Sequence, residues 1–348
     1  MRNPFRNSEH GRETTDNTVP TPGSSQLQPE SEVGQPQTEL DFIFIDHSRE
    51  GILKFRQEII ESIKNKQVIM IELITPNKKS RMRVQAALNY ITHNDLGHDE
   101  LNTRLQAQTD FDLLENMLCR ELVNSGVDIL LVDVNEDSSA QYKVLSRNFE
   151  IMRESFVRYL QNFSSPTRLK QHMVDAMKYE AEDIRFRDEL VVEQIQKTVT
   201  HKYYQGKRIA VIVGAAHTAQ YLAMQSTPGV EVNKVYPESV SSKHQTYIPT
   251  YSDEVVANIL NNKPDANTDE LLNKALLEKT IIWLTSFDIH SITTKEFREL
   301  IDKLSSGEVT AILEQVCELG IYDEQERKQR ADKYLLDILD NLQRQSTT

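Results

Sequence analysis

The chain has 348 residues, and its 40 Lys and Arg against 53 Asp and Glu give a net charge of −13, which disfavours nucleic acid and anionic membranes as partners. Its two cysteines, Cys119 and Cys317, form no spacing motif, which excludes a cysteine-based zinc site and a disulfide framework and fits a reducing compartment. The longest apolar run, Ile209 to Ala216, is far shorter than the roughly 18 to 20 residues that span a membrane. We expect a cytoplasmic protein without a membrane segment, with no secretory signal visible and a signal-free export route left open.

Residues 1–40 hold few strong apolar side chains and five of the eleven prolines of the chain. A segment of this composition cannot bury enough apolar surface to offset the entropy lost on ordering. The sequence therefore predicts a disordered tail, either a solvated leader or a recognition or export segment.

Strand and helix patterns alternate from Asp41 to Thr250. Apolar runs predict a strand at 42–45, helical spacing follows at 50–66, and a second strand lies at 68–73. The later elements are helices at 81–91 and 111–124, a strand at 127–134, helices at 140–162 and 167–204, a strand at 208–213, a short helix ending at Met224, and a strand at 230–236. This alternation predicts an α/β domain over residues 41–250, with a mostly parallel sheet flanked by helices.

Residues 251–348 lack the alternation of strand and helix patterns. A polar linker at 261–267 is followed by helical patterns, with one further possible strand at Ile281 to Leu284. We expect a mostly helical C-terminal region.

Four strands end in a titratable residue: His47, Glu72, Asp133 and His217. Because the carboxyl ends of parallel strands share one edge, where ligands bind, these side chains should converge there. Two imidazoles and two carboxylates suit either a divalent metal or proton transfer. Taken singly, each residue is more ordinary, as a loop, capping or solvated side chain.

Two further features point to the same edge. Gly214-Ala215-Ala216-His217 allows a close turn after a buried strand and would hold His217 over the edge, but it lacks the pattern of a phosphate loop. Arg187 shares a helix face with Val191 and Gln194, so that face can dock on the sheet with the guanidinium as an anion or oxyanion clamp. The ordinary alternative is an exposed charge run with i,i+4 pairs.

These motifs, in this order, resemble the TraB/Tiki and erythromycin esterase/ChaN-like superfamily over residues 41–236. The matching stretches are Phe42 to Ser48, the strand ending Ile71-Glu72-Leu73, Arg187-Asp188-Glu189, and Ile209 to His217 with its G-x-x-H motif. The resemblance implies an α/β sheet whose edge carries the catalytic groups, matched here by His47, Glu72, Arg187 and His217. Members include esterases, metal-dependent proteases and a haem-iron-binding lipoprotein.

The first motif departs from the family pattern, since Phe44 and Ile45 stand where Gly, often Gly-Glu, is usual before His47. Asp46 adjoins the histidine, but neighbours in a strand point to opposite faces.

Two functions follow as expectations. The first is a hydrolase acting on a small-molecule or peptide ester or amide, with Glu72, Arg187 and the two histidines as catalytic groups. A divalent metal (Mn, Co or Zn) on His47, Glu72, Asp133 and His217 would assist the reaction, or none would be needed. The second is a non-catalytic descendant that binds a protein partner through its N-terminal tail or C-terminal helices.

Overall fold

The computed structural model describes residues 37–46, 49–73, 75, 77–108, 113–134, 140–161, 165–237, 240–241, 248–286, 292–319 and 324–344. Most of the predicted tail, residues 1–36, lies outside these ranges, as does His47. Within them, every helix is too short or too polar to cross a membrane.

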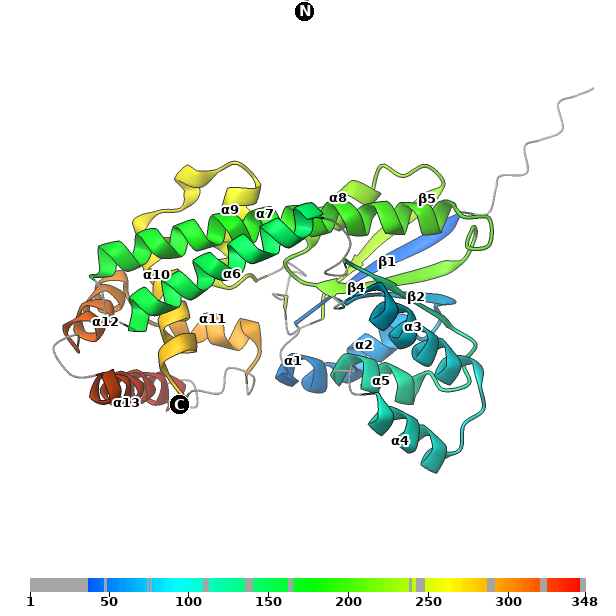
Figure 1. The fold of residues 1–348 in the computed structure, drawn as a ribbon, viewed down its shortest axis with the longest axis horizontal. Coiled ribbons are helices and arrows are strands. Elements are labelled where there is room, and N and C mark those ends of the chain that lie inside the picture. The colour runs from blue at the N-terminus through cyan, green and yellow to red at the C-terminus, as the bar shows by residue number, and fades with distance from the viewer. Residues whose placement is uncertain are drawn as a thin grey trace, which may run out of the picture. The chain divides into compact units, whose positions relative to one another are not determined.

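Five strands form one sheet in which all pairs are parallel, in the order β3-β2-β4-β1-β5 (Figure 1). The predicted parallel α/β architecture is therefore confirmed. The order brings the carboxyl ends of β2, β4 and β1 side by side at the centre of the sheet. The strands are β1 (Thr38–Ile45), β2 (Val68–Glu72), β3 (Asp128–Val132), β4 (Arg208–Gly214) and β5 (Val230–Val235).

Helices cover both faces of the sheet, which explains the continuous apolar runs at 42–45 in β1, 68–71 in β2 and 209–213 in β4. Along β1, Ile43 and Ile45 pack into one layer, whereas Phe42 and Phe44 pack into the other. The first layer is formed by α1 (Arg49–Lys54), α2 (Arg56–Ile63), α3 (Lys78–His93), α4 (His98–Ala107) and α5 (Leu113–Glu121). The second is formed by the C-terminal half of α7 (Pro166–Thr200) and by α8 (Thr218–Met224).

A separate apolar cluster joins the remaining helices within the same compact unit, residues 35–348. It contains α6 (Ala140–Gln161), the N-terminal half of α7, α9 (Tyr251–Leu260), α10 (Asp269–Leu284), α11 (Thr294–Asp302), α12 (Ser306–Glu318) and α13 (Glu324–Arg344), with a 3₁₀ turn at Pro264–Ala266. The long helix α7 therefore packs against the helical cluster with its first half and against the sheet with its second (Figure 1).

The possible strand at Ile281 to Leu284 is wrong, because these residues form the last turn of α10. Thr268 caps the start of the helix, because its side chain accepts a hydrogen bond from the Leu271 amide, and the buried residues of α10 recur at helical spacing down to Leu284. The β-branched residues near its end therefore follow a helix that capping and core packing have already fixed.

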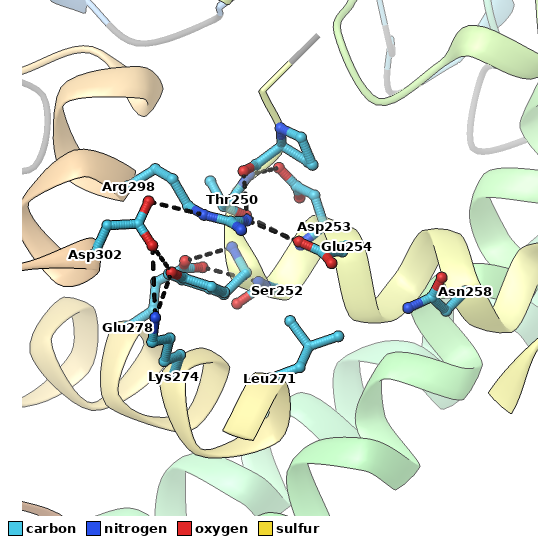
Figure 2. Close-up of polar contacts among 12 residues, drawn as sticks. Thr250, Ser252, Asp253, Glu254, Asn258, Leu271, Lys274, Glu278, Arg298 and Asp302 are labelled. Carbon is cyan, nitrogen blue, oxygen red and sulfur yellow. Dashed lines mark hydrogen bonds and ion pairs between the residues drawn. The ribbon is translucent and has the colours of Figure 1, made fainter. Parts of the chain in front are cut away.

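A polar cluster fastens α9, α10 and α11 to one another (Figure 2). The Arg298 guanidinium lies 3.5 Å from the ring centre of Tyr251 and donates to Glu254 at 2.9 Å. The Tyr251 hydroxyl contacts Asp302 and accepts from Lys274 at 3.0 Å. Because these groups come from three helices and pair with each other, they fix how the helices cross.

The helical cluster also contacts the carboxyl edge of the sheet. Asp46, directly after β1, accepts a hydrogen bond at 2.8 Å from the backbone amide of Thr294, the first residue of α11. A carboxylate there stabilises the helix by satisfying a free amide and opposing the helix dipole. Gly51 of α1 lies against the same carboxylate.

Gly51→Ala should destabilise the protein by about 1–3 kcal/mol, because the added Cβ would lie 2.8 Å from Cβ and Cγ of Asp46 and 2.9 Å from its carbonyl oxygen. Gly307→Ala in α12 is the matched control, since a Cβ there meets nothing within 4 Å. That substitution should stabilise by up to about 1 kcal/mol through helix propensity alone. Urea unfolding of both variants measures the difference, and two shifts of the same sign would contradict the predicted clash.

Candidate functional site at the carboxyl edge of the sheet

Glu72 and His217, from neighbouring strands, meet at the carboxyl edge. Glu72 is the last residue of β2, and His217 follows β4 at the start of α8. The Glu72 Oε1 atom lies 2.9 Å from His217 Nε2, and Oε2 accepts from the Gly214 amide at 3.0 Å. The close turn after β4 thus supplies both a backbone donor and the imidazole to the same carboxylate.

The second ring nitrogen of His217 is also bound. Its Nδ1 atom lies 2.6 Å from Asp188 Oδ1 on α7, and the same oxygen accepts from Gln220 Nε2 at 2.8 Å. An imidazole between two carboxylates donates from both nitrogens only when it is protonated. The geometry therefore favours imidazolium at His217.

Arg187 lies between two carboxylates. Its Nη2 atom is 2.7 Å from Glu72 Oε1 and 2.6 Å from Asp133 Oδ2, and its Nε donates to Asp133 Oδ1 at 3.2 Å. Asp133 directly follows β3 and is fully buried. Glu72, Asp133, Arg187, Asp188 and His217 thus form one continuous ion network, called the edge network below.

Two more side chains brace the backbone beside this network. Arg81 of α3 contacts the carbonyl oxygens of Leu131 and Asp133 and donates to Gln194 Oε1 at 2.6 Å. Gln194 in turn donates to the Asp133 carbonyl at 3.2 Å. The end of β3 is therefore held from both layers of helices.

Burial and ion pairing shift the pKa values of these side chains in opposite directions. Burial by itself would raise the pKa of Glu72, but His217, Arg187 and the Gly214 amide lower it to about 2. Burial would lower the pKa of His217, but Glu72 and Asp188 raise it to about 10. Burial raises the pKa of Asp133, and the contacts with Arg187 offset part of that rise. Burial would lower the pKa of Arg187, but Asp133 and Glu72 raise it. Glu72 and His217 are thus charged at neutral pH.

Four of the five residues predicted for the site come together: Glu72, Asp133, Arg187 and His217. His47 lies outside the described residues, and Asp46 before it faces α11. The predicted docking face of α7 is also present, since Arg187, Val191 and Gln194 all pack at the sheet.

Sequence reasoning missed Asp188, Gln220 and Arg81. Asp188 could have been found, because it adjoins Arg187 in a motif already singled out, and about 100° of helix rotation still leaves both able to face the sheet. Gln220 lies three residues after His217 in a helix, which is also a usable signal. Arg81 contacts backbone carbonyl oxygens some 50 positions away in the sequence, and no local sequence pattern predicts such a contact.

The donors at this edge do not fit a divalent metal as they are arranged. Among the described residues no three His, Cys, Asp or Glu side chains are grouped to hold a metal. The carboxylates of Glu72 and Asp133 already share the Arg187 cation, and both nitrogens of His217 are engaged. With His47 undescribed, the full predicted ligand set stays a prediction.

Among the described residues, three buried polar atoms around the edge network have no hydrogen-bond partner. These are Gln220 Oε1, Thr75 Oγ1 just after β2, and Asp183 Oδ1, one turn before Arg187 on α7. Burial raises the pKa of the Asp183 carboxyl, and Asp133 reinforces this while Arg187 opposes it. Unpaired buried polar atoms are costly, so these mark places where a water or a ligand group would be stabilised.

No family model, no curated protein and no solved structure matches this chain.

Proposed function

We propose that this chain is a non-catalytic binding protein with the fold of the TraB/Tiki and erythromycin esterase/ChaN-like superfamily, and that its partner is a protein. The observation that supports the proposal is that the charged groups of the edge network pair with one another. Each carboxylate in it contacts a protein cation, and both imidazole nitrogens contact carboxylates.

A hydrolase needs a base that takes a proton from water near neutral pH. Glu72, with a pKa of about 2, is too weak a base, and His217, with a pKa of about 10, already carries its proton. The same charges serve well to hold α7 against β2 and β3.

The contact made by Asp46 supports the same proposal. The family's usual acid position in the first motif is held by Ile45, and Asp46 is the only carboxylate beside it, yet the Asp46 carboxylate binds the first turn of α11. A carboxylate used to dock the C-terminal helices is not free for chemistry at His217.

An exposed apolar stripe on the helical cluster would suit a protein partner. Along α6, Val144, Ile151 and Tyr159 are 58%, 48% and 38% exposed and recur at spacings of seven and eight residues. Such spacing places them on one face of the helix, and an exposed apolar stripe is typical of an interaction surface.

A hydrolase is the second candidate, and the unpaired buried acceptors Gln220 Oε1, Thr75 Oγ1 and Asp183 Oδ1 favour it. Polar groups left unpaired at the ligand-binding edge of a parallel sheet suit a bound ester or amide. In that case Arg187 would steady the oxyanion and His217 would act as an acid after release from one carboxylate.

One experiment separates the two functions. The wild-type protein and His217→Gln are assayed on an ester and peptide panel, with and without Mn²⁺, Co²⁺ or Zn²⁺, and their stabilities are measured alongside. We expect no turnover by either protein and a clear loss of stability in the variant, because a buried charged partner is removed. Turnover by the wild type that falls 100-fold or more while the variant remains folded would establish the hydrolase instead.

A further inference from the structure

Three exposed apolar side chains lie along one face of α6, and they are called the α6 stripe below: Val144, Ile151 and Tyr159. Val144 and Tyr159 are 15 positions apart, so the stripe extends over about 22 Å of helix. Because the backbone of α6 is hydrogen-bonded within the helix, a partner meets side chains on this surface. Such a partner has to satisfy its own backbone groups, which a helix does and an extended segment does not.

Hollows beside the stripe have room for an anchoring side chain. Val157 of α6 and Trp283 of α10 line an open depression of about 250 Å³, and Trp283 is 40% exposed. Trp283 also borders a hollow of about 210 Å³ whose walls include Phe156, Met173 and Met177. An apolar cavity of about 150 Å³ is large enough for benzene, so this hollow has room for an aromatic or branched side chain. The methionine thioethers adapt to side chains of different shape.

The charge of α6 is opposite in sign to the charge of the whole chain. The helix holds four basic and two acidic residues, a balance of +2 on a chain of −13. The basic residues are Lys143, Arg147, Arg153 and Arg158. Arg153 pairs with Glu150 at 2.6 Å. Arg158 lies 3.7 Å from Glu154, and these two side chains are 76% and 63% exposed. Exposed pairs of this kind contribute little to stability, so the arginines can turn toward the carboxylates of a partner at small cost.

We infer that the α6 stripe and the hollow beside Trp283 bind an acidic amphipathic helix of a partner protein. This inference rests on the proposed function, because it specifies the chemistry of the partner. One apolar side chain of the bound helix enters the hollow, others pack on Val144 and Ile151, and flanking carboxylates face Arg147 and Arg158. A helix of about 15 residues covers the stripe, with apolar anchors three, four and seven positions apart. The apolar contacts supply affinity, and the charges select the partner.

Two other occupants fit this surface less well. A second copy of the chain would bring one basic α6 against another and would add the repulsion between two net charges of −13. An anionic membrane is repelled by the same net charge, and it offers no side chain to fill the hollow beside Trp283.

The inference is tested with the full-length protein as bait for a displayed library of amphipathic helical peptides of about 18 residues, long enough to cover the stripe. Apolar positions are filled from Leu, Ile, Phe and Met, and polar positions are randomised among Glu, Lys and Gln. The net charge of −13 attracts lysine-rich peptides to the surface as a whole, so enrichment of glutamate reports the local charge of α6. We expect glutamate-rich peptides to be selected and to shift the emission of Trp283, the single tryptophan of the chain.

Variants locate the binding surface. Ile151→Ser and Arg158→Glu should each weaken binding of a selected peptide at least about tenfold. Leu222→Ser on α8 is the control for the first, because Leu222 is also exposed, at 61%. Arg330→Glu on α13 is the control for the second, because Arg330 also pairs with a glutamate one turn earlier, Glu326. Both controls should leave the affinity unchanged.

Several results would each overturn the inference. These are a library that yields no binder, enrichment of lysine over glutamate, full affinity in a folded Ile151→Ser or Arg158→Glu variant, and Trp283 emission that responds to phosphatidylserine vesicles and not to the peptides. The ester and peptide hydrolysis assay is run on the same preparation. Turnover that depends on His217 would overturn the proposed function and would leave the measured peptide affinity as it stands, so the two failures are distinguishable.

Discussion

Replacing Arg187 with methionine is expected to lower the free energy of unfolding by about 3–5 kcal/mol, because it leaves two buried carboxylates without their shared cation. The side chains of Glu72 and Asp133 are only 4% and 0% exposed, so water cannot replace the guanidinium. Urea unfolding followed by circular dichroism measures the loss.

Arg185→Met is the matched control for this substitution. Arg185 lies two positions away on α7 and is exposed, and among the described residues its one hydrogen bond is a 3.4 Å contact with the Leu260 carbonyl. It should change stability by less than about 0.5 kcal/mol. A folded Arg187→Met protein as stable as Arg185→Met would show that the edge network does not hold the sheet.

The contribution of His217 to stability should fall as the pH rises from about 6.5 to about 10. Its pKa is raised from 6.5 in the unfolded chain to about 10 in the folded protein, so folding binds a proton over this window. The stabilisation is complete below pH 6.5 and is lost as pH rises through the folded pKa, with a slope of up to about 1.4 kcal/mol per pH unit. The wild type should therefore lose its advantage over His217→Gln across this range.

At acid pH the dependence of stability on pH is expected to have the opposite sign, and it arises from Glu72. The pKa of Glu72 is lowered from 4.5 to about 2, so its contribution to stability is present above pH 4.5 and is lost as pH falls toward 2.

The free energy of unfolding of the wild type, His217→Gln and His98→Gln is compared at each pH. His98 is an exposed control whose removal should leave the profile unchanged. A constant difference between wild type and His217→Gln from pH 6.5 to 10 would contradict the buried imidazolium.

Much of the fold was predictable because its central strands are buried on both faces. Strands such as β2 read as continuous apolar runs, which few other structures produce. Helix α4, at His98–Ala107, was missed because only Leu101 and Leu105 are buried, leaving a weak apolar stripe. The break at Phe55 between α1 and α2 was also missed, since helical spacing continues through it.

The residues of the candidate site were predictable only where the topology of the sheet alone determines where they lie. Glu72, Asp133 and His217 end parallel strands, and parallel strands bring such residues to one edge. Whether those side chains then bind a metal or pair among themselves depends on Arg187 and Asp188, which reach them from α7. Side-chain pairing of this kind is set by how a helix docks, and the spacing of residues along the chain does not encode it.

Helix α7 connects the helical cluster to the edge network. Met173, Glu180, Arg187 and Gln194 follow one another at intervals of seven residues, so they lie along nearly the same face of one helix. Met173 packs in the apolar cluster of the helices, whereas Arg187 and Gln194 hold the end of β3. Seven residues of α-helix span only about 10 Å. Because one rigid helix makes both sets of contacts, the ion pairs of Arg187 also fix the height and the rotation at which α7 meets the helical cluster.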